Sequence, residues 1–474
     1  MDLHVSLTGR RDLSGQLYRQ IRAAILDGQL RAGDALPPTR ELAGRLAVAR
    51  NTVAVAYERL AAEGFLVGRV GAGTFVRADL PELPGRRPAR RPPTTRAPRP
   101  RPVWEEVPVP AGLGRGRAEF DFRPGLPDAR LFPYQTWRRL VADQLRSSVA
   151  ATGRYGDPAG HAGLRAAIAR HVAVSRAVRA TPDEVVITNG VQHAVDLIGR
   201  VLVPPGDCVA VEDPGYPPPY WLFRSLGARV APVPVDHDGL VVDALPDDAR
   251  LVYVTPSHQF PLGVSMSLPR RMALLAWAYR HGAVVLEDDY DSEFRFTGRP
   301  VEPLQSLDRT GSVIYLGSFS KVLLPSLRLG FAVVPPSLHP AVRAARYVAD
   351  GHSPVPIQAA LARFIEEGRL ARHIRRMRHE YRERHLRIAE AIEAGGRDRL
   401  ELVPSVAGIH VSAYLPAGTD PAAVVRSARA VGVAVDSLRA YASSPAVRPG
   451  LVLGYGRIPA DRIGAGVARL SRCL

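Results

Sequence analysis

The sequence is poor in cysteine and contains no long hydrophobic run. Of its 474 residues only two are cysteines, Cys208 and Cys473, too few for a disulfide framework or a cysteine-rich metal site. No stretch approaches the roughly 18 consecutive apolar residues of a membrane-spanning helix, which excludes an integral membrane protein. The first residues contain no basic segment followed by an apolar run, so we expect no secretory signal. These absences predict a soluble, cytoplasmic protein that makes no membrane contact.

The sequence also has almost no lysine. Lysine and arginine total 63 against 46 acidic residues, a net charge of +17, and Lys321 is the sole lysine. The positive charge favours a polyanionic partner, although a genome that encodes arginine freely would give the same balance. Arginine serves as well as lysine on a surface, but its guanidinium does not deprotonate and forms no Schiff base. Lys321 is therefore a candidate nucleophile.

The composition divides the chain into three parts. Residues 1–79 look like a small helix-rich domain, and residues 118–474 alternate short apolar runs with segments of helical length. Between them, in the region 80–117, residues 81–102 hold eight prolines and seven arginines. Such a segment buries no core, so we expect an extended, semi-rigid linker; a phosphate-contacting tail is the alternative. In the large part, the buried strands of a parallel α/β sheet are predicted over 184–188, 208–211, 251–255, 283–286 and 313–316.

The first domain has the pattern of a DNA-binding fold. Apolar periodicity predicts helices over residues 13–28, 39–46 and 50–63, followed by a hairpin of 65–67 with 74–76. Three helices and a hairpin make a winged helix-turn-helix, whose third helix enters the major groove of double-stranded DNA. Arg50, Asn51 and Thr52 begin that helix, where side chains and free backbone N–H groups face the DNA. A protein-binding module is the alternative for this pattern.

Residues 36–76 resemble the signature of GntR-type winged-helix transcription regulators almost end to end. The position before the third helix often carries a hydroxyl residue in that family, and here it is Ala49, so one phosphate contact is missing. The resemblance implies DNA contacts in the helices and at the tip of the wing, made by Arg40, Arg50, Asn51, Thr52, Arg69, Val70 and Gly71.

The surroundings of Lys321 suit a pyridoxal-phosphate site. Two hydroxyl residues flank the lysine and Arg328 follows it, and both residue types bind phosphate. Upstream, Asp288 ends an apolar strand, where a carboxylate could pair with a protonated pyridine nitrogen. Gly190 precedes a helix whose N-terminus could bind the phosphate. Taken alone, the acidic cluster would suit a solvated or metal-binding turn, and Gly190 would suit a tight turn. Together with the sole lysine, these residues predict a cofactor site without a metal.

Residues 120–474 resemble the fold-type I aminotransferases. The resemblance implies that Lys321 forms the internal aldimine with pyridoxal 5'-phosphate, that Asp288 holds the pyridine nitrogen and that Tyr290 holds the 3'-oxygen. Tyr216 would stack on the ring, and Tyr155 would reach the phosphate of a partner subunit, which implies a homodimer. The phosphate would be held by Ser318, Ser320, Arg328 and the amides of Gly190 and Val191.

The order of the modules resembles the MocR family of transcription regulators. In that family a GntR-type domain precedes an aminotransferase-like domain. The sequences of segments 255–263 and 287–294 are also similar to motifs of that family. The resemblance implies a head-to-tail, domain-swapped homodimer in which each winged helix lies near the large domain of the other subunit.

Two departures from active aminotransferases stand out. Phe260 occupies the position of an asparagine that binds the cofactor's ring oxygen, with His258 as a substitute. No arginine for a substrate carboxylate falls within residues 451–455, although Arg439, Arg448 and Arg457 are near. Losing that bidentate partner weakens both substrate binding and orientation, so we expect a regulator and not an enzyme.

The sequence therefore predicts a pyridoxal-phosphate-dependent transcription regulator that binds DNA and senses the cofactor itself, as in control of vitamin B6. An amino acid or amine effector that bonds to the bound cofactor is the alternative. A working aminotransferase with an incidental DNA-binding arm is a further alternative. A degenerate scaffold is disfavoured by the intact set of Lys321, Asp288, Tyr290 and Arg328.

Overall fold

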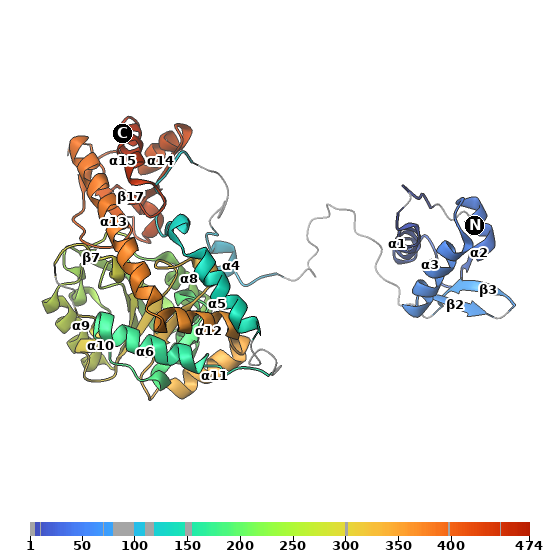
Figure 1. The fold of residues 1–474 in the computed structure, drawn as a ribbon, viewed down its shortest axis with the longest axis horizontal. Helices are drawn as coiled ribbons and strands as arrows, with labels where there is room; N and C mark the ends of the chain where they lie inside the picture. The colour runs from blue at the N-terminus through green and yellow to red at the C-terminus, as the bar shows by residue number, and fades with distance from the viewer. Residues whose placement is uncertain are drawn as a thin grey trace. The chain divides into compact units, whose positions relative to one another are not determined.

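The chain divides into two compact units, residues 1–100 and 101–474 (Figure 1). The structure, a computed structural model, describes residues 5–9, 11–69, 71–78, 99–109, 118–146, 154–298, 302–396, 399–445 and 447–474. Most of the region 80–117 expected to form a linker lies outside this description. Its described part includes a short helix, α4 (Val103–Glu106), which belongs to the second unit. The exact limits of the linker stay a prediction.

The first unit is a winged helix-turn-helix, as predicted. Its helices are α1 (Leu13–Leu26), α2 (Thr39–Arg45) and α3 (Arg50–Ala62). The hairpin consists of β2 (Leu66–Arg69) and β3 (Gly73–Val76), and β1 (Ala35–Leu36), which the sequence pattern missed, pairs with β3 as a third strand. Leu17, Ile21 and Leu60 are fully buried where α1 packs on α3. This core holds α3 in place and leaves its first turn facing solvent.

The second unit is built on an eight-stranded sheet with the order β5-β12-β11-β10-β9-β6-β7-β8. Neighbouring strands from β11 to β7 run parallel, whereas β12 and β8 are antiparallel to their neighbours. All five predicted strand segments are confirmed. The strands are β5 (Val185–Thr188), β6 (Cys208–Asp213), β7 (Arg229–Asp236), β8 (Gly239–Leu240), β9 (Ala249–Val254), β10 (Val284–Asp289), β11 (Val313–Ser318) and β12 (Gly330–Val333).

Helices cover both faces of this sheet, which explains why its strands are continuously apolar. Val186 and Leu316 face the side covered by α7 (Val191–Leu202), α8 (Pro217–Leu226) and α11 (His339–Asp350). Val185 and Tyr315 face the opposite side. That side is covered by α5 (Tyr134–Arg146), α6 (Ala162–Arg176), α9 (Leu268–His281) and α12 (Val355–Glu366).

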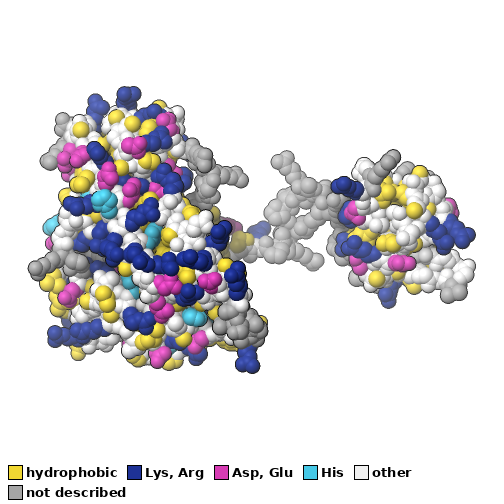
Figure 2. Space-filling view, in the orientation of Figure 1, with side chains coloured by type: hydrophobic (Ala, Val, Ile, Leu, Met, Phe, Trp, Pro, Cys, Tyr) yellow, Lys and Arg dark blue, Asp and Glu magenta, His cyan; other side chains and the backbone are white. Residues whose placement is uncertain are grey.

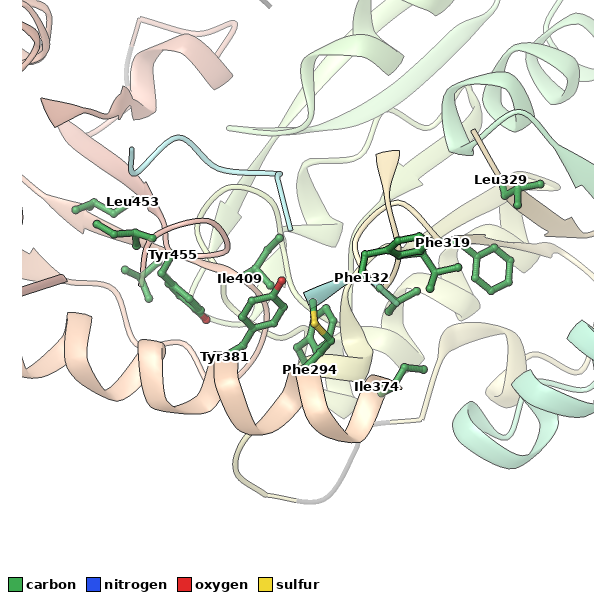
Figure 3. Close-up of a cluster of buried hydrophobic side chains, with 14 of the residues drawn as sticks. Phe132, Phe294, Phe319, Leu329, Ile374, Tyr381, Ile409, Leu453 and Tyr455 are labelled. Carbon is green, nitrogen blue, oxygen red and sulfur yellow. The ribbon is translucent and has the colours of Figure 1, made fainter. Parts of the chain in front are cut away.

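A C-terminal layer packs beside the large sheet. It holds α13 (Arg369–Ala394), α14 (Pro421–Ala430), α15 (Ala460–Ser471) and a sheet of β13 (Glu401–Leu402), β14 (His410–Tyr414), β17 (Gly450–Gly454) and β16 (Asp436–Ser437). Figure 3 shows the core that joins the layers, in which the Tyr381 ring on α13 meets the Phe294 ring edge-on, with 4.8 Å between the ring centroids. Ile409 and Tyr455 lie in the same cluster. This packing brings the start of β14 towards the large sheet.

Arginine dominates the charged surface. Figure 2 shows lysine and arginine side chains, all of them arginine except Lys321, over the viewed faces of both units. On α13, for example, Arg372, Arg375 and Arg376 are exposed while Ile374 and Met377 face the core. Within the described part of the chain, no helix combines the length and hydropathy needed to cross a membrane.

Candidate DNA-binding surface and cofactor site

The predicted DNA contacts in the helices lie in the first turn of α3 and in the first turn of α2. Arg40, Arg50 and Asn51 are exposed and Thr52 is half-buried. Ala49 occupies the N-cap, and its side chain caps no backbone N–H, although the Thr52 amide donates to the carbonyl of Ala49 at 2.9 Å. The N-terminus of the helix therefore suits an external acceptor such as a phosphate. The one side-chain contact of Arg50 that the structure gives is a long one, from Nε to Oγ1 of Thr39 at 3.5 Å. Three of the four predicted helix contacts are therefore exposed, and the contact of Arg50 with Thr39 links the starts of α3 and α2.

The wing tip carries a further arginine. Arg69 and Gly71 are exposed, and the Arg69 guanidinium lies 5.0 Å from the centre of the Phe75 ring. Gly71 has a φ of +75°, a backbone conformation that glycine adopts more readily than residues with a side chain. Val70 lies outside the described residues. The contacts of all these residues with DNA stay predictions.

A cavity of about 810 Å³ opens in the second unit where the parallel strands end. Ligands of α/β sheets commonly bind at this carboxyl edge. Asp288 stands near the end of β10 and Ser318 ends β11, which explains how residues far apart in sequence meet here. The predicted cofactor residues that line the cavity are Val191, Tyr216, Asp288, Tyr290, Ser318, Ser320, Lys321 and Arg328.

Lys321 lies in this cavity with its amine on a backbone oxygen. Nζ donates to the carbonyl of Gly125 at 2.7 Å, a contact that sequence reasoning missed. Burial lowers the pKa of the Lys321 amine, while the carboxylates of Asp291 and Asp288 oppose that shift. A lowered pKa raises the fraction of unprotonated amine, the form that attacks a carbonyl.

Asp288 presents a buried acceptor to the cavity. The Tyr253 hydroxyl donates to its Oδ2, whereas Oδ1 is buried and has no hydrogen-bond partner among the described residues. Burial raises the pKa of Asp288 to about 7. An unpartnered buried carboxylate oxygen is costly, and a ligand N–H in the cavity would satisfy it. The site therefore fits the ring nitrogen of pyridoxal phosphate. Tyr253 was missed because the order of the strands is not readable from sequence.

Gly190 and Arg328 form a cradle for an anion. Gly190 caps the N-terminus of α7 with a φ of +84°, and an added Cβ would lie 3.1 Å from the Arg328 guanidinium. Arg328 donates to the carbonyl of Asn189 at 2.7 Å. The Asn189 amide is in turn held by Asp350 at 2.8 Å and Ser353 at 2.6 Å. A guanidinium beside a helix N-terminus fits a phosphate.

His258 reaches the site through Tyr290. Its Nδ1 lies 3.0 Å from the Tyr290 hydroxyl and 3.1 Å from both Asp291 oxygens, and its Nε2 lies 3.1 Å from Ser405. His258 is not among the residues that line the cavity. Sequence reasoning missed Asp291 and Ser405, although Asp291 stands in the acidic run after β10. The predicted role of His258 at the ring oxygen gains no support from this position.

The two remaining predicted tyrosines differ in placement. Tyr216 lines the cavity and meets the Phe260 ring edge-on, with 5.8 Å between centroids. Burial raises the pKa of Tyr216 to about 12, so its hydroxyl stays protonated. Tyr155 is 96% exposed and does not line the cavity, and its nearest ring is His352 at 6.1 Å. Its reach to a partner subunit stays a prediction.

The arginines near the C-terminal strand lie elsewhere. Arg457 donates to Asp121 at 3.0 Å, Arg448 pairs with Glu401, and Arg439 donates to the carbonyl of Ser444. None of the three lines the cavity. On β17 itself, Val452 packs with buried Leu262 and Leu438.

Two families match this chain. Residues 13–76 match the bacterial regulatory proteins of the gntR family, and residues 128–448 match aminotransferase class I and II. Among full-length relatives, a probable rhizopine catabolism regulatory protein, MocR, from Rhizobium meliloti is 40% identical over 96% of this chain and 92% of its own length. The pyridoxine biosynthesis transcriptional regulator PdxR from Corynebacterium glutamicum is 32% identical over 99% and 98%.

A solved structure resembles the second unit. The α-aminoadipate aminotransferase of Thermus thermophilus, complexed with N-(5'-phosphopyridoxyl)-L-leucine, is 32% identical. It aligns with a TM-score of 0.69 over 78% of this chain and 98% of its own. The expected combination of folds is thereby confirmed.

Proposed function

Because this chain belongs to the MocR family of transcription regulators, in which a GntR-type winged helix is fused to an aminotransferase-like domain, we propose that its affinity for DNA responds to pyridoxal phosphate. The observation that carries the proposal is the buried, unpartnered Oδ1 of Asp288 in the cavity that holds the sole lysine. The aminotransferase fold implies pyridoxal-phosphate binding, and the regulator family implies DNA binding.

Each end of the cofactor has a matching group in the cavity. When bound, pyridoxal phosphate supplies an aldehyde that condenses with a primary amine and releases water. Lys321 supplies that amine, and Asp288 holds the ring nitrogen. Arg328 and the N-terminus of α7 at Gly190 hold the phosphate. Tyr290 holds the ring oxygen; its hydroxyl is positioned by His258, which in turn contacts Asp291.

Control of vitamin B6 is the output that we favour. The relative from Corynebacterium glutamicum regulates pyridoxine biosynthesis by name, and it aligns over almost the whole of both chains. An amino acid or amine that bonds to the bound cofactor is the second candidate. It is favoured by the relative named for rhizopine catabolism, because that name points to a signal other than the cofactor.

We also propose that the chain is not a working aminotransferase. A substrate carboxylate needs a cation to orient it, and Arg439, Arg448 and Arg457 have partners outside the cavity. The DNA contacts follow the exposed groups of the first unit, with Arg40 and Arg50 as the main ones. The assembly is a head-to-tail homodimer, in which Tyr155 of each subunit reaches the phosphate of the other.

The test of this function has two parts. Absorption spectra recorded during a titration of the cofactor-free protein should develop the band of lysine-bound pyridoxal phosphate, and Lys321→Ala should lack it. Incubation of the loaded protein with amino acids and a keto acid should give no sustained turnover. Absence of the band in the parent protein would contradict cofactor binding, and rapid turnover of any amino acid would make the chain an enzyme.

A further inference from the structure

The charges that line the cavity determine which ligands it accepts. Among the described residues that line it, the cationic side chains are Lys321 and Arg328, and the cofactor would engage both. His410 also lines the cavity, but burial and the nearby His258 lower its pKa well below the usual range, so it is neutral. Its Nε2 is hydrogen-bonded to the carbonyl of Pro261 at 3.0 Å. A ligand carboxylate would therefore find no free cationic partner among the described residues that line this cavity.

One wall of the cavity is aromatic. Phe260 lies 5.0 Å from the Tyr441 ring and 5.8 Å from the Tyr216 ring, both edge-on, and 5.3 Å from His410. On β17, where the sequence comparison would place an arginine for the carboxylate, Val452 belongs to an apolar cluster with Leu262 and Leu438, and Tyr441 packs against this cluster. Aromatic side chains in such arrangements bind another ring through its edge or face.

A second apolar part of the cavity lining comes partly from residues 101–109, at the start of the second unit. Trp104, Val107 and Val109 line the cavity together with Trp221 and Leu222 of α8. Trp104 is 53% exposed. Large apolar groups at the rim of a cavity are a common feature of sites for ligands with an apolar part.

Polar contacts fix this segment to α8. Arg101 donates to the carbonyl of Ser225 at 2.8 Å, and Glu106 pairs with Arg224, also at 2.8 Å. The Arg224 guanidinium lies 5.1 Å from the Trp221 ring. A ligand that packs on Trp104 thus contacts a wall that is continuous, through the chain, with the DNA-binding unit.

We propose that the effector cavity takes a primary amine with an aromatic or other apolar substituent and no carboxylate, and that this substituent packs against the wall formed by Trp104, Val107 and Trp221. The inference rests on the proposed function, and within it on the second candidate effector, because the amine would bond to the cofactor held at Lys321. It goes further in naming the class of effector and the segment that senses it. Occupation of the wall changes the environment of residues 101–109, and thereby the affinity of the protein for its DNA.

The experiment uses the full-length, pyridoxal-phosphate-loaded protein and three probes. 2-Phenylethylamine and L-phenylalanine differ only in the carboxylate, whereas ethylamine lacks the ring. Dissociation constants come from calorimetry, and affinity for the DNA upstream of its own gene is measured with each probe. We expect 2-phenylethylamine to bind about tenfold tighter than either of the others, and to shift the DNA affinity.

Trp104→Ala tests the wall, with Tyr279→Ala as its matched control. Tyr279 is an aromatic residue on α9 that is 70% exposed and does not line the cavity. Trp104→Ala should weaken 2-phenylethylamine binding at least about fivefold and abolish its effect on DNA affinity, with cofactor binding unchanged. Tyr279→Ala should match the parent protein.

Three results would overturn the inference while leaving the proposed function intact. They are equal or tighter binding of L-phenylalanine, equal binding of ethylamine, and a Trp104→Ala protein that responds like the parent. If instead pyridoxal phosphate fails to bind, or binds without any effect on DNA affinity, the proposed function itself fails.

Discussion

The two units place their functional groups in opposite environments. In the first unit Arg40, Arg50 and Asn51 stand exposed on a small helical core, and the structure gives them few internal partners. In the second unit Asp288 and Lys321 lie in a cavity, where burial shifts the pKa of each towards its neutral form. The partners explain the contrast. DNA arrives as a large polyanion that meets surface charge, whereas a small cofactor is enclosed and must satisfy every buried polar atom.

This contrast separates two kinds of sensitivity. Exposed arginines act through long-range charge, so their contribution falls with salt. Buried groups act through hydrogen bonds and protonation, so their contribution depends on ligand shape and pH. Variants in one unit should therefore leave the primary binding reaction of the other unit intact, and only the coupling between the two should need both.

The largest effect is expected from Asp288→Asn. The substitution removes the charge that pairs with the cofactor's ring nitrogen, and hydrogen bonds to charged groups of this kind correspond to about a 10- to 100-fold change in affinity. Cofactor titration followed by absorption measures it. Asp183→Asn, at a carboxylate whose side chain is 94% exposed, is the control. Binding within about threefold of the parent would remove Asp288 from the site.

Arg50→Ala tests the exposed DNA contacts of the first unit. Loss of this contact should weaken binding to the operator by about tenfold and lower the salt dependence by about one phosphate, with cofactor affinity unchanged. Arg59 on the same helix is the matched control, because its guanidinium lies 3.9 Å over the Tyr18 ring and pairs with Glu63. If Arg59→Ala lost as much operator affinity as Arg50→Ala, α3 would contribute only its net positive charge and no specific contact of Arg50.

Gly190→Ala tests the anion cradle. The new Cβ would lie 3.1 Å from the Arg328 guanidinium, so we expect about a fivefold loss of cofactor affinity. Gly206→Ala separates this from backbone strain, because Gly206 has a similar φ of +94° but open space around its Cβ position. Both variants should be destabilised, by about 1 kcal/mol each. Equal cofactor affinity in the two variants would argue against the cradle.

The last effect concerns the pH dependence of stability. Burial raises the pKa of Glu212 to about 7 from its ordinary 4.5, although Thr255 donates to Oε2 at 2.6 Å; Oε1 has no partner among the described residues. Between these two values the folded state holds more protons than the unfolded one, so stability falls as pH rises. One proton corresponds to a slope of about 1.4 kcal/mol per pH unit.

Glu212→Gln should reduce that slope in the cofactor-free protein by about 1.4 kcal/mol per pH unit, while Glu287, Asp288 and Glu293, whose pKa values burial also raises to about 7, keep their own contributions. Urea unfolding at pH 5, 6 and 7, followed by tryptophan fluorescence, measures it, because all four tryptophans lie in the second unit. Asp183→Asn should keep the slope of the parent. An unchanged slope in Glu212→Gln would show that other groups account for the pH dependence.

Local patterns predicted much of this molecule, and long-range pairings explain what they missed. The helices from Leu13, Thr39 and Arg50 and the five buried strands follow from apolar spacing within a few residues. β1 was missed because a two-residue strand carries no period of its own, and it exists only by pairing with β3.

The site shows the same division. Lys321 is notable by composition alone, and the resemblance to aminotransferases supplied the predicted cofactor residues. Tyr253 and Gly125 contact Asp288 and Lys321 from 35 and 196 residues away in sequence, and no local signal reports such contacts. The place of Trp104 in the cavity was missed for another reason, because the proline and arginine content of its segment predicted a solvated linker.

The most direct test of the account is the operator affinity of the cofactor-free protein, titrated with pyridoxal phosphate alone at fixed salt. The account predicts a clear shift in affinity for the parent protein and no shift for Lys321→Ala, which should still bind DNA. If the cofactor binds Lys321 and the operator affinity of the parent stays constant, sensing of pyridoxal phosphate is contradicted.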